Sequence, residues 1–67
     1  MDELKQALFE EALYHKRQYQ RCRKRLGEFD FITLTHEEKH MTLYGIIVEG
    51  DCENEFLDWE QEMQQGG

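Results

Sequence analysis

Residues Thr35 to Gln64, THEEKHMTLYGIIVEGDCENEFLDWEQEMQ, carry the strongest structural signal in this sequence. Thr35 suits the N-cap of a helix, and Glu38, three residues later, can complete a capping box. Beyond it, apolar or small side chains recur at spacings of three and four, which places them on one helical face. These positions are Met41, Gly45, Val48, Cys52, Phe56, Trp59 and Met63. The pattern predicts a single helix over 35–64 whose stripe needs a partner.

A partner helix is predicted for residues 2–27, which contain no proline and, before Gly27, no glycine. Its stripe positions also recur at spacings of three and four. They are Leu4, Leu8, Ala12, His15, Tyr19, Cys22 and Leu26. Asp2 near the start suits the helix macrodipole, as do the cations near the end, and Gly27 can adopt the left-handed conformation that ends a helix.

The short connection over 28–34 predicts that the two helices lie antiparallel. Its apolar side chains are expected to plug that end of the hairpin; they are Phe29, Phe31, Ile32 and Leu34. The predicted fold is therefore all-α: an antiparallel two-helix hairpin in a single domain over 1–67. Both helices carry more apolar residues than one seam uses, which further predicts that two hairpins pair into a dimeric four-helix bundle.

An α-β-β-α arrangement is the alternative fold, with strands over 29–34 and 41–48, because both segments are rich in aromatic and β-branched residues. The intervening turn, however, contains no glycine, asparagine or proline. Two glycines weaken the predicted second helix. Gly45 lies on the stripe, where it would permit a close approach of the helices, whereas Gly50 has no such role and a kink is expected near it.

A family resemblance rests on Leu34-Thr35-His36-Glu37-Glu38 followed by Leu43-Tyr44-Gly45-Ile46. This pattern resembles the second helix of small helical-hairpin proteins encoded by bacteriophages and prophages. The resemblance implies an accessory protein that acts through contacts, for example as a modulator or inhibitor of a host protein. It implies no catalytic residues.

The chain length and the net charge limit the classes of function that are compatible with this sequence. A chain of 67 residues hides only about 60% of the surface that its unfolded form exposes, so we expect self-association, at least into a homodimer. The net charge of −7 argues against a protein that coats nucleic acid or anionic lipid. No apolar run is long enough for a membrane span or a signal peptide, which predicts no membrane partner, a cytoplasmic location and reduced thiols at Cys22 and Cys52.

Charges of opposite sign are segregated along the chain. Carboxylates fill 49–62, which contains no lysine or arginine, and folding the hairpin about residues 32 and 33 places this run opposite 3–16, so that acid meets acid. A solvated surface is one interpretation. The other is that a second copy packed head to tail, or a partner with a basic or apolar surface, relieves the repulsion.

The candidate protein-binding residues are aromatic side chains and carboxylates of the acidic end. They are Tyr14, Tyr44, Glu49, Asp51, Glu55, Asp58, Trp59 and Glu62. Aromatic anchors often dominate binding energy, but they are as often core residues. For Trp59 we favour the core of the dimer, opposite Gln6 and Ala7.

Nucleic-acid association is the alternative function. One route is direct binding by the basic stretch over 16–25; its cations are Lys16, Arg17, Arg21, Arg23, Lys24 and Arg25. The other is mimicry of DNA by the acidic run over 49–62. The negative net charge opposes the first route, and the second requires an ordered array of carboxylates.

His36-Glu37-Glu38-Lys39-His40 matches the His-Glu-x-x-His pattern of zinc metalloproteases. It lies in the first turn of a predicted helix, on a chain too small for a substrate cleft and without an obvious third ligand. The predicted hairpin brings His15 near Cys52 and Cys22 near His40, but no Cys-x-x-Cys pair supports a structural metal. We therefore expect a non-enzyme with no catalytic residues, cofactor or metal.

Overall fold

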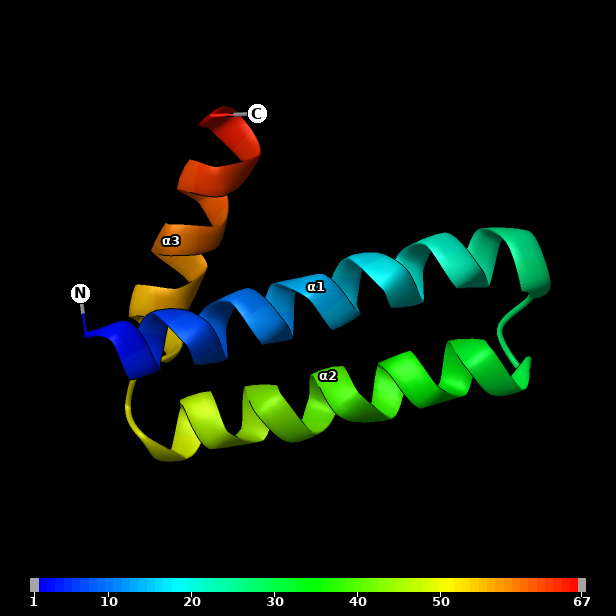
Figure 1. The fold of residues 1–67 in the computed structure, drawn as a ribbon, viewed down its shortest axis with the longest axis horizontal. Coiled ribbons are helices and arrows are strands. Elements are labelled where there is room, and N and C mark those ends of the chain that lie inside the picture. Colours follow the sequence, from blue (N-terminus) through cyan, green and yellow to red (C-terminus); the bar gives the residue numbers. More distant parts are fainter. Residues whose placement is uncertain (1, 67) are drawn as a thin grey trace.

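The computed structural model describes residues 2–66 and contains three α-helices in that range: α1 (Glu3–Leu26), α2 (Phe31–Glu49) and α3 (Glu53–Gly66) (Figure 1). No strand occurs among the described residues, so the all-α prediction is confirmed and the α-β-β-α alternative is wrong. α1 and α2 form the predicted antiparallel hairpin. The predicted second helix over 35–64 is wrong, because it is divided between α2 and α3. Met1 and Gly67, which belong to the predicted domain, lie outside the described residues.

The first helix matches its prediction closely. The carboxylate of Asp2 accepts a hydrogen bond from the backbone N–H of Leu4 at 2.9 Å, which caps the N-terminus of α1. At the other end Gly27 has φ 97° and ψ 162°, a conformation open essentially to glycine alone. Local chemistry therefore determines both ends of α1.

The second helix begins earlier than predicted. Its N-cap is Asp30, whose carboxylate accepts a hydrogen bond from the N–H of Ile32 at 2.9 Å. Thr35, the predicted cap, lies inside the helix and donates its hydroxyl hydrogen to the carbonyl of Phe31 at 2.8 Å. The capping box is therefore wrong and the connection shortens to residues 27–30, because aspartate is also a preferred N-cap residue and occurs first along the chain.

The break between α2 and α3 occurs at Gly50 and Asp51. The N–H of Cys52 bonds to the carbonyl of Ile47, and the N–H of Asp51 bonds to the carbonyl of Val48, at 3.0 and 3.1 Å. Together these bonds form a Schellman motif. Asp51, not the adjacent glycine, occupies its left-handed position, with φ 57°. The expected kink near Gly50 is thus a complete helix end.

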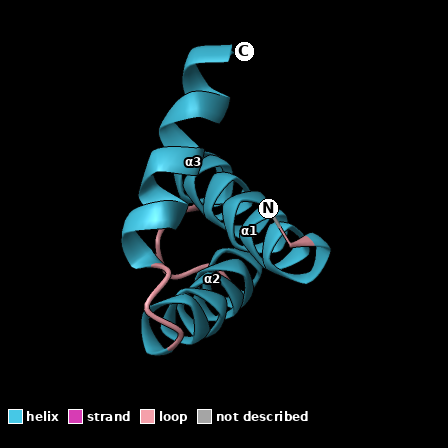
Figure 2. Cartoon of the chain, turned by 90° about the vertical axis from the view of Figure 1, so that its left-hand side faces the viewer, coloured by secondary structure: helices cyan, strands magenta, loops and turns pink. Residues whose placement is uncertain are grey.

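The third helix folds back and supplies part of the core. In Figure 2 it lies on one flank of the α1–α2 pair. The ring centroid of Phe56 lies 5.2 Å from that of Phe9 and 6.1 Å from that of Trp59. The buried apolar core consists of Phe9, Ala12, Leu13, Ile47, Phe56 and Trp59. Few backbone positions of α3 approach the hairpin, so α3 is attached mainly through these side chains.

Pairing between the helices differs from the predicted register. His15 meets His36, and the carbonyl of Ala12 meets His40, so the turn half of α2 packs on the middle of α1. Phe9 does face Phe56, as the fold about residues 32 and 33 requires. The prediction that acid meets acid is wrong at the pairs that join α1 to α3, because both are ion pairs: Lys5 with Glu55 at 3.0 Å and Lys16 with Glu60 at 2.9 Å.

Gly45 does not mediate a close approach of the helices. A Cβ atom at this position would meet nothing within 4 Å. The glycine lies on an exposed part of α2 instead. Its lack of a side chain therefore contributes no packing contact, contrary to the expectation from the stripe.

Candidate protein-interaction surfaces

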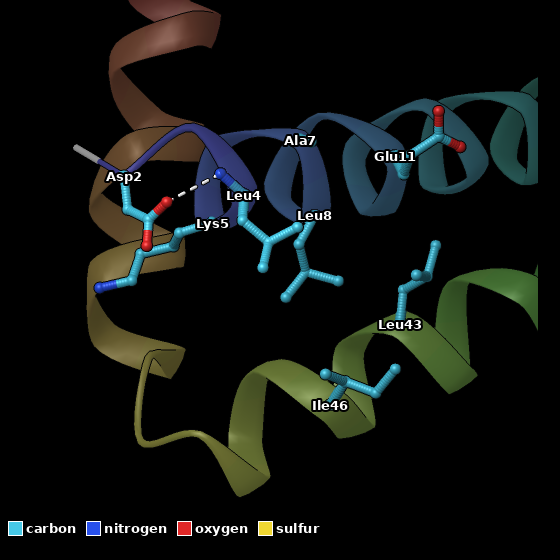
Figure 3. A pocket seen from close by; sticks show the side chains of 8 residues that line it. All are labelled: Asp2, Leu4, Lys5, Ala7, Leu8, Glu11, Leu43 and Ile46. Atoms are coloured by element: carbon cyan, nitrogen blue, oxygen red, sulfur yellow. Dashed lines mark hydrogen bonds between the residues drawn. The ribbon is translucent and has the colours of Figure 1, made fainter.

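An apolar groove runs between α1 and α2 at the open end of the hairpin, where α1 begins and α2 ends. Its walls are Leu4, Ala7, Leu8, Leu43 and Ile46, and its rim carries Asp2, Lys5 and Glu11; we refer to these residues as the groove. Figure 3 shows Leu4 and Leu8 extending from α1 toward Leu43 and Ile46 of α2. The groove is a shallow depression that is largely open to solvent.

The groove lies on a different face of α1 from the one that α3 covers. Phe9, Leu13 and Lys16 belong to the face that packs against α3. Leu4 and Leu8 follow a separate stripe of the helix, and α3 passes behind α1 in the view of Figure 3. Leu4 is 79% exposed and Ile46 is 50% exposed. Leu8 and Leu43, at the floor of the groove, are half-buried and pack against the core, so the described chain leaves only the outer part of this apolar face uncovered.

A second exposed apolar group surrounds the turn between α1 and α2. It comprises Leu26, Phe29, Phe31, Ile32 and Leu34, which we call the turn cluster. Phe29 is 84% exposed and Phe31 is 82% exposed, so the prediction that these side chains plug the hairpin is wrong. The reason is the early start of α2, which leaves a turn of four residues too short to fold back over the helix ends. Exposed clusters of large apolar side chains commonly mark interaction sites.

Two histidines join the helices midway along the hairpin. Their Nδ1 atoms are 3.0 Å apart, which requires that one imidazole of the His15–His36 pair donates while the other accepts. Burial is the main cause that lowers the pKa of His15, followed by the neighbouring His36 and Lys39, while Glu11 acts in the opposite direction. The pair therefore favours the neutral state of His15 at neutral pH.

The His-Glu-x-x-His motif lies on α2, and both of its histidines face α1. His36 bonds to His15, and Nδ1 of His40 lies 3.1 Å from the carbonyl oxygen of Ala12. Cys52 instead lies at the α2–α3 turn, where its thiol donates to the carbonyl of Gly50 at 3.2 Å. Within residues 2–66, no group of three or more His, Cys, Asp or Glu side chains is arranged to hold a metal ion.

The aromatic members of the candidate protein-binding set divide between core and surface. Trp59 is 8% exposed and packs against Phe9 and Phe56, so it belongs to the core of the single chain. Tyr44 is half-buried, and its hydroxyl donates to Glu53 at 2.7 Å; this hydrogen bond is the main cause that raises the pKa of Tyr44. Tyr14 is exposed, with its ring near those of His15 and His36.

The carboxylates of that set are exposed but lie on separate elements. Glu49 ends α2, Asp51 occupies the turn that follows it, and Glu55 is tied to Lys5. Asp58 and Glu62 lie exposed on α3, four residues apart. Glu55, Asp58 and Glu62 follow spacings of three and four and so share one face of α3, where Lys5 pairs with Glu55.

One buried charge escapes any prediction from the helical stripes. Glu60 is only 6% exposed, and both of its carboxylate oxygens accept from the ammonium of Lys16, at 3.0 and 2.9 Å. The one feature of the sequence that points to this burial is the position of Glu60 next to Trp59 on α3. A glutamate beside a stripe position can be buried only where an opposing cation neutralises its charge.

The cations of the basic stretch lie on two sides of α1. Arg17, Arg21, Lys24 and Arg25 recur at spacings of three and four and share one face, whereas Lys16 and Arg23 lie on another. Lys16 is engaged by Glu60 on the side of α3. Arg17 and Arg21 line a different hollow together with Trp59, whereas Arg23 and Lys24 border another near the C-terminal end of the helix. Arg25 is exposed on the last turn.

Comparison of this chain with protein-family models, with curated proteins and with solved structures gives no significant match. Among the described residues, no helix is both long enough and apolar enough to cross a bilayer.

Proposed function

We propose that this chain is a non-enzymatic protein-interaction module that associates with a second copy of itself and modulates or inhibits another protein. The observation that carries the proposal is the uncovered apolar groove. Leu4 and Ile46 remain largely exposed there although the chain has a core of only a few residues. A small domain gains stability when a second polypeptide covers such a face, because apolar area leaves water.

The resemblance to phage-encoded helical-hairpin proteins agrees with this proposal. Leu43 and Ile46, which belong to the resembling segment, both line the groove. An accessory protein of that kind acts by occupying a surface of a host protein. In the proposal, pairing of two hairpins into a four-helix bundle covers the groove, and the exposed carboxylates Asp58 and Glu62 on α3 face a partner with a basic surface.

A photocrosslinking experiment in cells tests the proposal. Replacement of Ile46 by p-benzoylphenylalanine places the reactive group in the groove, and the same replacement of Gln20, which is exposed on α1, serves as the control. Irradiation should give discrete protein adducts from the groove position and few from the control. A groove position that crosslinks to no protein, a second copy included, would contradict the interaction role.

The same reagent at Glu62 tests the modulator part separately. We expect an adduct with a second protein whose contact surface is basic, identified by mass spectrometry of the crosslinked peptide. Adducts only between copies of this chain would restrict the function to self-association.

A further inference from the structure

We infer that the groove of each chain receives the turn cluster of a second copy, in an antiparallel dimer with two-fold symmetry. The inference deepens the proposed function, on which it rests, by naming the surface that occupies the groove. Both surfaces belong to the same hairpin and lie at its opposite ends, the groove at the open end and the turn cluster at the turn (Figure 1). An antiparallel pairing therefore brings each turn cluster over the partner's groove, twice per dimer.

Charge complementarity supports this occupant. The turn cluster follows Arg23, Lys24 and Arg25 along the chain, and all three are exposed. Two carboxylates lie within the turn, Glu28 and the N-cap Asp30, so the cations are in excess by one. The groove has the opposite character, because Asp2 and Glu11 lie on its rim and the single cation there, Lys5, is already paired with Glu55. An apolar surface with cations beside it thus meets an apolar surface with carboxylates beside it. The reverse arrangement, with like ends together, would place cations beside cations.

The shape of the apolar parts fits the same assignment. Phe29 and Phe31 extend from the turn with more than four fifths of their surface exposed, whereas the groove is a hollow between two helices. A projecting aromatic side chain that fills an apolar hollow is the usual form of a binding anchor. A second hollow, bordered by His15 and Lys39, shares Glu11 and Leu43 with the groove and continues it toward the turn. This continuity provides a contact surface along the hairpin between the two ends.

The molecule is large enough for the required interface. A stable dimer buries about 800 Å² on each partner. This area is about a sixth of the 5123 Å² that the chain exposes. Contact along one face of the hairpin would leave the flank that carries α3 exposed.

Two variants test the inference, one with the turn cluster disabled and one with the groove disabled, each alone and in a mixture of the two. The turn variant carries Phe29→Ser and Phe31→Ser, and the groove variant carries Leu4→Gln and Ile46→Gln. All four positions are at least half exposed, so each variant should retain the helical circular dichroism of the unaltered chain. Met41→Gln, at an exposed position outside both surfaces, is the control.

Sedimentation velocity then measures association. We expect the unaltered chain and the control to dimerise, and each double variant alone to be monomeric, with a dimer Kd raised by about 30-fold or more. An equimolar mixture of the two variants should form a 1:1 heterodimer, because one turn cluster and one groove remain intact and face each other. High salt should weaken the dimer of the unaltered chain.

Three outcomes would overturn the inference. A turn variant that still dimerises would show that grooves pack on grooves without the turn cluster, and a mixture that stays monomeric would show that the two surfaces do not contact. An unaltered chain that is monomeric at all concentrations would remove the dimer. In the first two cases, adducts between copies at the groove position would still support self-association. In the third, only adducts with another protein would support the modulator role, so the failure of the inference and that of the proposed function are distinguishable.

Discussion

The two ends of the α1–α2 hairpin differ in what covers their aromatic side chains. At the open end, α3 folds back and buries Phe56 and Trp59 against Phe9. At the turn end, Phe29 and Phe31 remain 84 and 82% exposed. Aromatic residues are therefore buried where a third helix provides an opposing surface, and exposed where the chain simply reverses direction. The comparison predicts that truncation of an aromatic side chain lowers the free energy of unfolding much more at the open end than at the turn end.

The largest effect is expected for Trp59→Ala. Truncation of a buried aromatic side chain costs about 3 to 5 kcal/mol, which would unfold α3 and destabilise the small core. Phe29→Ala is the matched variant at the turn end and should change the free energy of unfolding by less than about 0.5 kcal/mol at concentrations where the chain is monomeric. Urea denaturation followed by far-ultraviolet circular dichroism measures both, and equal losses would contradict the contrast between the ends.

A smaller loss is expected for Lys16→Met. This change leaves the carboxylate of Glu60 buried without its cation, at a cost of about 2 to 3 kcal/mol. The double variant Lys16→Met/Glu60→Met should recover much of that stability, because it removes the unpaired charge. Lys5→Met breaks the more exposed pair with Glu55 and should have little effect. Thermal melts of the unaltered chain and of these three variants test the expected order of stability. A loss of stability for Lys5→Met equal to that for Lys16→Met would be inconsistent with the burial of Glu60.

Substitutions at the two turns of the chain should change the free energy of unfolding in opposite directions. Gly27→Ala forces a side chain into φ 97° and should destabilise by about 1 to 2 kcal/mol. Asp51→Gly removes the strain of a left-handed aspartate and should stabilise by about 0.5 to 1 kcal/mol. Midpoints of chemical denaturation give both values. Destabilisation by Asp51→Gly would show that the aspartate side chain contributes more than its backbone conformation costs.

The turn half of α2 also contains a buried polar group. Thr33 is fully buried, and its hydroxyl has no hydrogen-bond partner among the described residues. Thr33→Val keeps the shape and removes the hydroxyl, so we expect stabilisation by about 1 kcal/mol. A lower melting temperature for this variant would indicate that the hydroxyl is satisfied in solution.

The smallest effect concerns pH and the His15–His36 pair. Because the pKa of His15 is lowered below 6.5 in the folded chain, its contribution to stability is complete above that pH, where both folded and unfolded chains carry neutral imidazole. As the pH falls below 6.5, the unfolded chain binds the proton first and the free energy of unfolding decreases until the folded-state pKa is passed. His15→Gln should reduce the difference in stability between about pH 7.5 and about pH 5.5. An unchanged difference would assign the pH dependence to other groups.

The sequence predicted the helices better than the surfaces. The periodic spacing that includes Phe56 and Trp59 correctly indicated a helix with a buried face, and Trp59 is indeed a core residue. The same pattern could not show that this face turns back onto Phe9, because a stripe continues unbroken through Gly50 and Asp51 in the sequence. Among the candidate binding residues, Trp59 was predicted to lie in the core of a dimer, whereas it lies in the core of the single chain. The excess of apolar residues indicated a second packing surface, but its position in the groove was not predicted, because the groove arises only when Leu4 and Leu8 meet Leu43 and Ile46.

Local interactions explain what the sequence alone determined. Helix content, the cap at Asp2 and the stop at Gly27 depend on residues within one turn of each other, so they can be read without knowledge of the fold. The start of α2 at Asp30, the end at Asp51 and the direction of α3 involve competition between comparable local signals. Contacts between distant residues decide the end of α2 and the direction of α3, because burial of Phe56 and Trp59 against Phe9 outweighs the strain of one left-handed aspartate. Tertiary structure therefore determined which apolar face is covered and which is left exposed.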